Sequence, residues 1–432
     1  MGGGRPSCGE CLQLSIVGAH RDLPMCMTSG KCNAGRCKDR YVLLDQLGRH
    51  KRLLLLQGPN GPFFARLARR LARAGCEIRK VNFNGGDALF FPGSRAISFR
   101  KPMDEWREFL IALLNAEAPE AIVLFGQWRP QHRIAIDVAK GRGLRFYVFE
   151  EGYIRPWWIT LEAGEVNAGS HLRELDLAAI PDQPTPRQPV RFRFAFAKMA
   201  CWSFLYFLFG MVLRSRFPHY EHHRPFELRE AGCWLRSLFR KCRYVLTERD
   251  LRRQLLDPSG AGFFLVPLQL STDSQLLYAS PWRSNVAFIS HVIRSFSRHA
   301  NDTDLLVFKH HPMERGHADY AADIDRLARQ YGISSRVRYL RDARIPALLK
   351  RAKGVVLINS TVGLQALFHR VPLCTCGDAF YNKDALVPSQ SVDAFWKRPI
   401  AASDVVFRKF YRYMLRETQI NASFYVESIE TE

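Results

Sequence analysis

The feature that most constrains this chain is a series of short apolar runs, each followed by a turn and then by a segment with helical spacing. The run at 51–57 (KRLLLLQ) is apolar throughout its centre, which is typical of a strand buried on both faces. A turn rich in glycine and proline and a predicted helix at 63–74 follow it. Further strands are predicted at 77–83, 121–125 and 144–149, and a further helix at 134–140. This β-α-β alternation predicts an open parallel sheet.

The same alternation returns in the second half of the chain, after residue 262. Strands are predicted at 263–266, 305–309, 336–339, 355–358 and 372–375, with helices at 285–298, 317–331, 345–352 and 363–370. The sequence therefore predicts an α/β protein with two Rossmann-like lobes. Two such lobes with a cleft between them make a GT-B-like architecture.

Changes in composition suggest where the domains begin and end. At 432 residues, the chain is long enough for two domains. Four prolines within 181–189 break any regular element and are typical of a linker. The expected regions are a disordered cysteine-rich leader at 1–48, an N-terminal lobe on the acceptor side at 49–164, a basic helical insertion at 165–258, a C-terminal lobe on the donor side at 259–390 and C-terminal helices at 391–432.

The cysteines do not predict a metal site. Five of the 11 cysteines lie in the first 40 residues: Cys8, Cys11, Cys26, Cys32 and Cys37. One CxxC motif occurs there, but no second pair follows at the spacing of a structural zinc site. The remaining cysteines are scattered, which fits a reducing cytoplasm. No apolar stretch of a signal peptide follows the first basic residue.

The chain is strongly basic, with a formal net charge of +22 and an isoelectric point near 9.8. Such a charge attracts nucleic acids, anionic lipid headgroups or anionic substrates, and the charge alone does not choose among them. No helix-turn-helix, RNP or zinc-finger pattern occurs, so nucleic-acid binding is not expected.

Two segments mix aromatic and basic residues. The first, at 192–213, is uncharged only from Met199 to Leu213, which is too short to span a bilayer. It is either a buried helix between the lobes or a helix that lies in the membrane interface. The second, at 406–416, either contacts the membrane or is an amphipathic helix packed across both lobes, and the packed alternative is favoured.

Two adjacent carboxylates are the first candidates for catalysis, because ligands bind beyond the carboxyl ends of parallel strands. Glu150 and Glu151 follow the strand at 144–149 and precede a glycine. Neighbouring residues in a strand point to opposite faces, so one carboxylate can face the cleft. It could act as a base on an acceptor hydroxyl or as a nucleophile on an anomeric carbon. The alternative is a solvated turn.

Three segments of the second lobe are candidates for binding a phosphate or a sugar. Lys309, His310, His311 and Pro312 end one strand, and the proline biases His311 towards an extended conformation. His311 could bind a phosphate, or the two histidines could simply be partly exposed. Adjacent histidines cannot easily converge on one metal ion.

The second of these segments runs directly from a strand into a helix. Asn359, Ser360 and Thr361 are favoured helix caps, and helix N-termini bind anions. They predict a phosphate site, with a plain capped helix as the alternative. The third segment contains Gln269, which could orient a sugar or belong to an ordinary loop. In the first lobe, the turn that contains Asn60 is a similar candidate for contact with the acceptor or the donor.

Five segments occur in a specific order along the chain: 57–64 (QGPNGPFF), 149–157 (FEEGYIRPW), 267–269 (PLQ), 309–312 (KHHP) and 359–363 (NSTVG). In this order they resemble the capsular polysaccharide biosynthesis/export family of the KpsS/LipB type, over most of the chain from 53 to 396. The resemblance implies a β-Kdo transferase that builds a Kdo linker on a lyso-phosphatidylglycerol acceptor. The implied donor is CMP-β-Kdo.

The order of an acidic-Gly, a His-Pro and a Ser/Thr motif is also similar to bacterial sialyltransferases, which use a CMP-activated keto-sugar acid. By this resemblance Glu151 is the catalytic carboxylate, with Glu150 beside it, and His311, Ser360 and Thr361 contact CMP and stabilise the departing phosphate. Relatives often carry Glu-Asp-Gly where this chain has Glu-Glu-Gly, which leaves open whether Glu151 is a nucleophile or a base. The other donor-side candidates are Gln269, Lys309, Pro312 and Asn359, and the acceptor-side candidates are Asn60, Gln127, Tyr153 and Arg155.

The resemblance and the charge together predict an enzyme held on the cytoplasmic face of the inner membrane, because the sugar and the lipid headgroup are both anionic. CMP carries a single phosphate, so no metal or other cofactor is expected. Other capsule assembly or export proteins are candidate partners. The alternatives are a transferase with another CMP- or UDP-sugar donor and a non-catalytic export or scaffold component.

Overall fold

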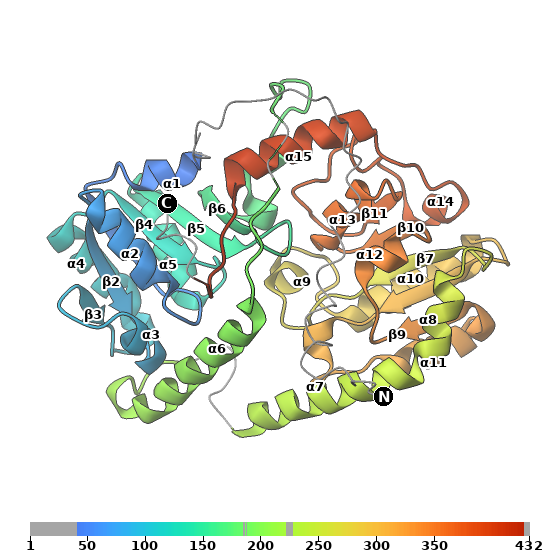
Figure 1. Ribbon diagram of the computed structural model, residues 1–432, viewed down its shortest axis with the longest axis horizontal. Coiled ribbons are helices and arrows are strands. Elements are labelled where there is room, and N and C mark those ends of the chain that lie inside the picture. The colour runs from blue at the N-terminus through green and yellow to red at the C-terminus, as the bar shows by residue number, and fades with distance from the viewer. Residues whose placement is uncertain (1–40, 185, 187, 222–227, 427–432) are drawn as a thin grey trace, which may run out of the picture. The chain divides into compact units, whose positions relative to one another are not determined.

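The computed structural model of the protein describes residues 41–184, 186, 188–221 and 228–426. These residues form two compact units, each described by itself (Figure 1). The N-terminal unit contains 41–235, 378–383 and 403–426, and the C-terminal unit contains 236–377 and 384–402. Residues 1–40 of the expected leader lie outside the described residues.

The N-terminal unit is built on a seven-stranded sheet with the strand order β12-β6-β5-β4-β1-β2-β3. Its strands are β1 (Arg52–Leu55), β2 (Glu77–Asn82), β3 (Ala96–Ser98), β4 (Ala121–Phe125), β5 (Arg145–Glu151), β6 (Ile159–Ala163) and β12 (Gln419–Ile420). The strands from β3 to β5 pair in parallel, whereas β6 is antiparallel to β5 and β12 is antiparallel to β6.

Helices cover both faces of this sheet. They are α1 (Val42–Leu47), α2 (Phe63–Arg73), α3 (Gly85–Phe90), α4 (Trp106–Glu117), α5 (Pro130–Gly141), α6 (Ala195–Val212) and α15 (Asp404–Thr418), with 3-10 turns at Met103–Glu105, Asn167–Gly169, His171–Arg173 and Arg214–Arg216. Leu53 and Leu55 of β1 belong to the core on one face, with α2, and Leu54 belongs to the core on the other face, with α4. Because successive strand residues point to opposite faces, a continuous leucine run is what such a doubly covered strand needs.

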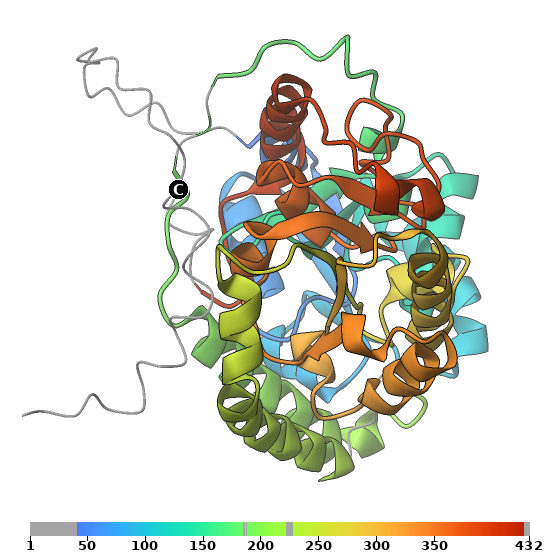
Figure 2. The same cartoon turned by 90° about the vertical axis from the view of Figure 1, so that its right-hand side faces the viewer.

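The C-terminal unit has a five-stranded, all-parallel sheet with the order β11-β10-β7-β8-β9. Its strands are β7 (Phe263–Pro267), β8 (Leu305–Lys309), β9 (Val337–Leu340), β10 (Ala352–Leu357) and β11 (Leu373–Thr375). They can be followed in Figure 2 by their yellow to orange-red colours.

The helices of this unit also lie on both sides of its sheet. They are α8 (Arg249–Leu256), α9 (Ser274–Tyr278), α10 (Asn285–His299), α11 (Ala321–Gln330), α12 (Ile345–Leu349), α13 (Val362–Phe368) and α14 (Val392–Lys397), with 3-10 turns at Pro312–Glu314 and Ser334–Arg336. Helix α7 (Leu228–Thr247) crosses the boundary between the units at residue 235.

The expected fold class, two Rossmann-like α/β lobes, is confirmed, but three details of the expected organisation were wrong. Residues 42–47, assigned to the leader, form α1, and its Leu44 and Leu47 are buried in the core. The strands β6 and β12 were not expected. The region 391–432 was expected to be helical only, yet it contains β12, which pairs with β6.

The aromatic and basic segment at 192–213 forms α6 (Ala195–Val212), and most residues of this helix are half-buried or exposed. Tyr206 and Gly210 are buried, whereas Phe196, Phe204 and Val212 are exposed. Of the two alternatives for this segment, a fully buried helix does not agree with the exposed side chains of α6, and contact with the membrane interface stays a prediction. By length and composition alone, α6 could cross a bilayer, but a single such helix is weak evidence of a membrane span.

The segment at 406–416 lies within α15. Phe407, Phe410 and Met414 are buried on one face of this helix, and that face packs within the N-terminal unit. This burial supports packing rather than membrane contact for α15.

Candidate functional site

The sheet of the N-terminal unit brings several predicted residues to one edge. The adjacent strands β1, β4 and β5 are parallel, so Asn60 and Gln127, which follow β1 and β4, lie at the same edge as the two glutamates, which end β5. Glu150 and Glu151 are both half-buried. A methyl group built on Gly126, at the end of β4, would lie 3.7 Å from Oε2 of Glu150. The carboxylate therefore lies over the end of the neighbouring strand.

The two glutamates lie within electrostatic range of Tyr425. Oε1 of Glu150 accepts the N–H of Glu151 at 3.0 Å. Burial, together with the negative charges of Glu151 and Glu150, raises the pKa of Tyr425, whereas Arg155 and Arg129 act in the opposite direction. Tyr425 thus lies within electrostatic range of both carboxylates and of both arginines.

The other acceptor-side candidates differ in their surroundings. Gln127 is buried, and its amide group bonds to both backbone groups of Val166, at 3.1 and 2.8 Å. Arg155 is exposed and donates to the carbonyl of Gly152 at 3.3 Å, and Asn60 is half-buried. The contacts of Gln127 account for this side chain as a structural residue.

Tyr153 is also buried, and its hydroxyl is engaged twice. It donates to Oε1 of Glu162 at 2.5 Å and accepts the N–H of Asn167 at 2.7 Å. Glu162 is fully buried and also accepts from Ser170 at 2.6 Å. These bonds favour a structural role for Tyr153 over the predicted contact with an acceptor.

The sequence analysis missed a buried polar cluster at the carboxyl end of β1. The Tyr206 hydroxyl accepts from Nε2 of Gln57 and Nδ2 of Asn84, both at 2.7 Å, and donates to Asp87 at 3.3 Å. The buried Lys80 lies 3.8 Å from Asp87, and burial lowers its pKa. These bonds hold α6 to the edge of the sheet. In the sequence, nothing distinguishes Tyr206 from the other aromatic residues of this segment.

The sheet of the C-terminal unit brings the donor-side candidates together in the same way. The adjacent strands β10, β7 and β8 carry their following residues to one edge. Nε2 of Gln269 donates to Oδ1 of Asn359 at 3.0 Å, and the N–H of Asn359 returns a bond to Oε1 of Gln269 at 3.3 Å. Both side chains are buried, so the pair braces the ends of β7 and β10.

The two histidines after β8 have different environments. Nδ1 of His311, which is half-buried, accepts the N–H of Met313 at 3.2 Å. In the neutral ring the proton is then on Nε2, which is a hydrogen-bond donor. His310 is buried, and its Nδ1 lies 2.7 Å from the Tyr339 hydroxyl. Burial and the nearby charge of Lys309 lower the pKa of His310 to about 3, so its ring is neutral.

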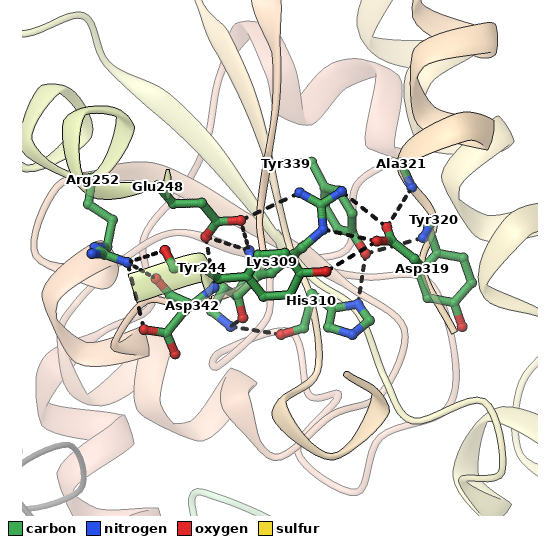
Figure 3. A network of polar contacts seen from close by, with 11 residues as sticks. Tyr244, Glu248, Arg252, Lys309, His310, Asp319, Tyr320, Ala321, Tyr339 and Asp342 are labelled. Atoms are coloured by element: carbon green, nitrogen blue, oxygen red, sulfur yellow. Dashed lines mark hydrogen bonds and ion pairs between the residues drawn. The ribbon is translucent and has the colours of Figure 1, made fainter. Parts of the chain in front are cut away.

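The ammonium group of Lys309 is bonded to two backbone carbonyls. Its ammonium donates to the carbonyls of His310 at 2.7 Å and Arg341 at 3.3 Å, within the polar network of Figure 3. Burial, followed by the charge of Arg315, lowers the pKa of Lys309 to about 8. Lys309 thus connects the ends of β8 and β9, and its place among the donor ligands stays a prediction.

The two hydroxyl residues after β10 are half-buried. Oγ of Ser360 accepts the N–H of Val362 at 3.3 Å, and Thr361 directly precedes α13. The adjacent Asn359 donates to the carbonyl of Gln275 at 3.0 Å. Nε2 of Gln275 is buried and has no hydrogen-bond partner among the described residues. Hydroxyl and amide donors therefore gather at this end of β10.

Glu314 is a further residue that the sequence analysis missed. It lies in the turn after Pro312 and is buried, and its carboxylate accepts the N–H of Ser271 at 2.7 Å and the hydroxyl of Ser271 at 2.6 Å. Glu314 therefore ties the loop after β8 to the loop after β7. The only signal in the sequence is its position two residues after the His-Pro pair.

Two further observations concern metals and cavities. Within the ranges that the structure describes, no group of three or more His, Cys, Asp or Glu side chains is placed to hold a metal ion. A hollow of about 880 Å³ in the N-terminal unit is lined by His50, Glu120 and Arg145 among others. These residues lie at the amino ends of β1, β4 and β5, at the opposite edge from the two glutamates.

Comparison with known proteins identifies the family. A family model described as capsule polysaccharide biosynthesis protein matches residues 120–425, which is well over half of the chain. The chain belongs to this family. The matched range includes Glu150, Glu151 and all the donor-side candidates of the C-terminal unit.

Two relatives within the family cover most of the chain. The capsule polysaccharide export protein KpsS of Escherichia coli is 39% identical over 378 residues, which are 87% of this chain and 97% of that protein. The capsule polysaccharide modification protein LipB of Neisseria meningitidis serogroup A is 35% identical over 382 residues, or 86% and 91% of the two chains. The predicted resemblance to the KpsS/LipB type is confirmed.

Solved structures of more distant proteins are also similar. The β-Kdo 2,7 transferase of Thermosulfurimonas dismutans KpsC has a TM-score of 0.42 and 13% identity, and covers 83% of this chain and 89% of its own. The β-Kdo 2,4 transferase of the same KpsC has a TM-score of 0.39 and 13% identity, with 73% and 82% covered. Both scores are low, and we draw no conclusion about activity from them.

Proposed function

We propose that this protein is a glycosyltransferase of capsule polysaccharide biosynthesis that moves Kdo from CMP-β-Kdo to a lyso-phosphatidylglycerol-type lipid and so starts a poly-Kdo linker. The observation that carries the proposal is the gathering of candidate residues at the carboxyl edge of each sheet. One edge has the carboxylates Glu150 and Glu151, and the other has the donors of His311, Ser360 and Thr361. A carboxylate can take the proton of an acceptor hydroxyl, and hydrogen-bond donors can stabilise the negative charge of a departing phosphate.

On the donor side, His311 and the two hydroxyl residues act on the phosphate of CMP. When the bond between the anomeric carbon and the phosphate oxygen breaks, negative charge develops on that oxygen. Nε2–H of His311 and the hydroxyls of Ser360 and Thr361 donate hydrogen bonds to the phosphate and stabilise this charge. No metal or other cofactor takes part in the proposed reaction.

On the acceptor side, Glu151 has two chemically balanced roles. As a base, it takes the proton of the acceptor hydroxyl while the acceptor oxygen bonds to the anomeric carbon and CMP leaves. As a nucleophile, its carboxylate displaces CMP first, and the acceptor oxygen then displaces the carboxylate, which takes the proton of the acceptor hydroxyl as it is released. Arg129 and Arg155, which like the glutamates lie within electrostatic range of Tyr425, attract the carboxylate of the sugar or the phosphate of the lipid.

The membrane part of the proposal rests on α6 and the residues around it. Exposed apolar side chains of this helix, among them Phe196 and Phe204, lie between exposed basic residues at Arg193 and Arg214. This combination is typical of a helix in the interface of an anionic membrane. It supports a protein held on the cytoplasmic face of the inner membrane, where it would meet a lipid acceptor and other proteins of capsule assembly.

The test is a transfer assay with CMP-Kdo generated in situ and a fluorescent lyso-phosphatidylglycerol, followed by mass spectrometry. Wild type is expected to add the mass of Kdo, and Glu151→Gln is expected to lose at least about 100-fold in rate with unchanged thermal unfolding. His311→Ala is expected to lose activity as well. Glu117→Gln, a change in a partly exposed ion pair with Arg79, is the matched control.

Three results would contradict parts of the proposal. Full activity of Glu151→Gln would remove its catalytic role. Loss of activity with a chelator, together with turnover of a UDP-sugar, would show that the donor is a UDP-sugar and not CMP-β-Kdo. A folded wild type that transfers no sugar from a panel of CMP- and UDP-sugars, with a Glu151→Gln variant that still supports full capsule export in cells, would favour a non-catalytic export component.

A further inference from the structure

Helix α7 has an inner face that is fastened to the C-terminal unit. Arg236, Arg240 and Tyr244 are spaced four residues apart and so lie on one side of the helix. The contacts that they make are Arg240 to the carbonyl of Arg315 at 2.7 Å, Arg236 to the carbonyl of Gly316 at 3.5 Å, and the Tyr244 hydroxyl to Asp319 at 3.4 Å. All three partners belong to the loop that follows His311 and Pro312, so α7 holds the loop of the donor side.

The C-terminal end of α7 continues this attachment. Glu248, four residues after Tyr244, is buried and accepts the N–H groups of Arg341 at 3.0 Å and Asp342 at 2.9 Å. The Arg341 guanidinium lies 5.1 Å from the centre of the Tyr244 ring, and Figure 3 shows Tyr244 and Glu248 within the same network as Lys309 and His310. The ends of β8 and β9 are therefore both held from this one helix.

The outer face of α7 is apolar and exposed. Leu235, Leu238, Phe239 and Leu246 are 71%, 53%, 69% and 75% exposed. At about 100° per residue, these four positions fall within an arc of roughly 100°, on the side of the helix opposite Tyr244. The helix thus presents one polar face to its own unit and one apolar face away from it.

The charges beside this apolar face have one sign. Between 232 and 249 the chain has five basic residues and one acidic residue, Glu248, which is buried and faces inward. Arg243 and Arg249 are exposed, and Lys241 is partly exposed. The next residue, Asp250, is exposed and pairs with Arg253 at 3.9 Å. Within 232–249, an apolar stripe with basic flanks and no exposed acid complements an anionic bilayer. A second copy of this chain would bring the same positive charge to the face and be repelled.

We infer that the outer face of α7, defined as Leu235, Leu238, Phe239 and Leu246, docks on an anionic lipid bilayer. The inference rests on the proposed function in that a lipid acceptor gives the protein a reason to bind a bilayer. It adds a second membrane contact beside α6, within the insertion at 165–258 for which contact with the membrane surface was expected. Because the inner face of α7 holds the loop after His311, docking brings the donor side to the membrane that contains the acceptor.

The test is co-sedimentation of the full-length protein with vesicles of phosphatidylglycerol and phosphatidylethanolamine, compared with vesicles of phosphatidylcholine. The double variant Leu238→Glu/Phe239→Glu is expected to reduce the fraction bound to anionic vesicles at least about tenfold. The matched control is Val405→Glu, which changes a 76% exposed apolar residue of α15. A second variant, Lys241→Glu/Arg243→Glu, tests the basic flank, with Arg329→Glu on the exposed surface of α11 as its control.

The inference is overturned if the double variant binds anionic vesicles as wild type does while it stays folded by circular dichroism. It is also overturned if wild type is a dimer by light scattering and the double variant is a monomer, because α7 would then cover a protein interface. The transfer assay with a short-chain, detergent-dispersed acceptor separates the two proposals. If the double variant transfers sugar in this assay but no longer binds vesicles, both the proposed function and the docking surface are supported. If the protein binds vesicles through α7 but transfers no sugar, only the docking surface is supported.

Discussion

The hydroxyl of Tyr339 lies 2.7 Å from Nδ1 of His310, at the carboxyl ends of the adjacent strands β9 and β8. The neutral ring of His310 has one N–H group, so either the hydroxyl donates to Nδ1 or Nδ1–H donates to the hydroxyl, which also accepts the N–H of Tyr320 at 3.3 Å. His310 is thus a buried, neutral residue that is bonded to Tyr339 and lies directly before His311. This arrangement determines how the stability of the protein depends on pH.

The stability is expected to fall in mild acid because of His310. Its pKa is about 3 in the folded protein and about 6.5 in the unfolded chain, so the unfolded state binds more protons between these values. The contribution of the neutral ring is complete above pH 6.5 and is lost as the pH falls towards 3. From pH 7 to pH 5 the loss is about 2 kcal/mol. Urea unfolding of wild type and His310→Asn at several pH values measures it.

His310→Asn is expected to remove most of the pH dependence of the free energy of unfolding in the transition of the C-terminal unit. His132 in the N-terminal unit also has a pKa lowered to about 3, mainly by burial, so a slope from that unit remains. His219→Asn changes an exposed histidine and serves as the control. An unchanged slope in His310→Asn would contradict the prediction.

Glu314→Ala is expected to destabilise the protein by about 2–4 kcal/mol. The substitution leaves both the N–H and the hydroxyl of Ser271 without their carboxylate partner, and hydrogen bonds to a buried charge are the stronger kind. Ser271→Ala, which removes one of the two bonds, is expected to cost about 1 kcal/mol. Urea unfolding of both single variants and of the double variant measures their coupling energy. If the losses in the free energy of unfolding were additive, a direct interaction between Glu314 and Ser271 would be contradicted.

The strands of the sheets could be predicted because each is a short apolar run with clear ends. The bounds of β4 and β8 agree with the predicted ranges residue for residue. In contrast, β12 is only two residues long, and it exists because it pairs with β6, more than 250 residues earlier in the chain. A local pattern contains no information about such a partner.

The candidate site was predictable to the same extent. The order of parallel strands puts Gln269 beside Asn359, because the strands before them are neighbours in the sheet. The environments of Gln127, Tyr153 and Lys309 were not predictable, because their partners come from distant segments or from the backbone. A residue type indicates what a side chain can do, but burial and partners decide whether it is available.

Tyr153→Phe is expected to reduce stability by about 1–2 kcal/mol and to leave the kinetic constants of the folded protein nearly unchanged. The hydroxyl bonds to Glu162 and to the N–H of Asn167, and its loss leaves both without this partner. Thermal unfolding and the transfer assay measure the two effects. Tyr413→Phe, on the partly exposed surface of α15, is the control. A KM for the acceptor that rises tenfold at unchanged stability would restore the acceptor role predicted from the sequence.

Gly85→Ala is expected to displace α6 from the N-terminal unit and to cost about 2–4 kcal/mol. A Cβ at Gly85 would come within 2.1 Å of the Phe209 carbonyl oxygen, which belongs to the backbone of α6 and cannot rotate away. The displaced helix would lose the bonds of Tyr206 to Gln57 and Asn84, and its aromatic segment should become more accessible to chymotrypsin. Urea unfolding and limited proteolysis measure both effects.

Gly141→Ala is the matched control for Gly85→Ala, because both glycines lie in helices. A Cβ at Gly141 meets nothing within 4 Å, so alanine there should stabilise α5 by about 0.5–1 kcal/mol through its higher helix propensity. Opposite signs for the two substitutions would show that the close approach of α3 and α6, and not the loss of a glycine, causes the effect. If Gly85→Ala were as stable as wild type and had the same proteolytic pattern, α6 would not be held by this contact.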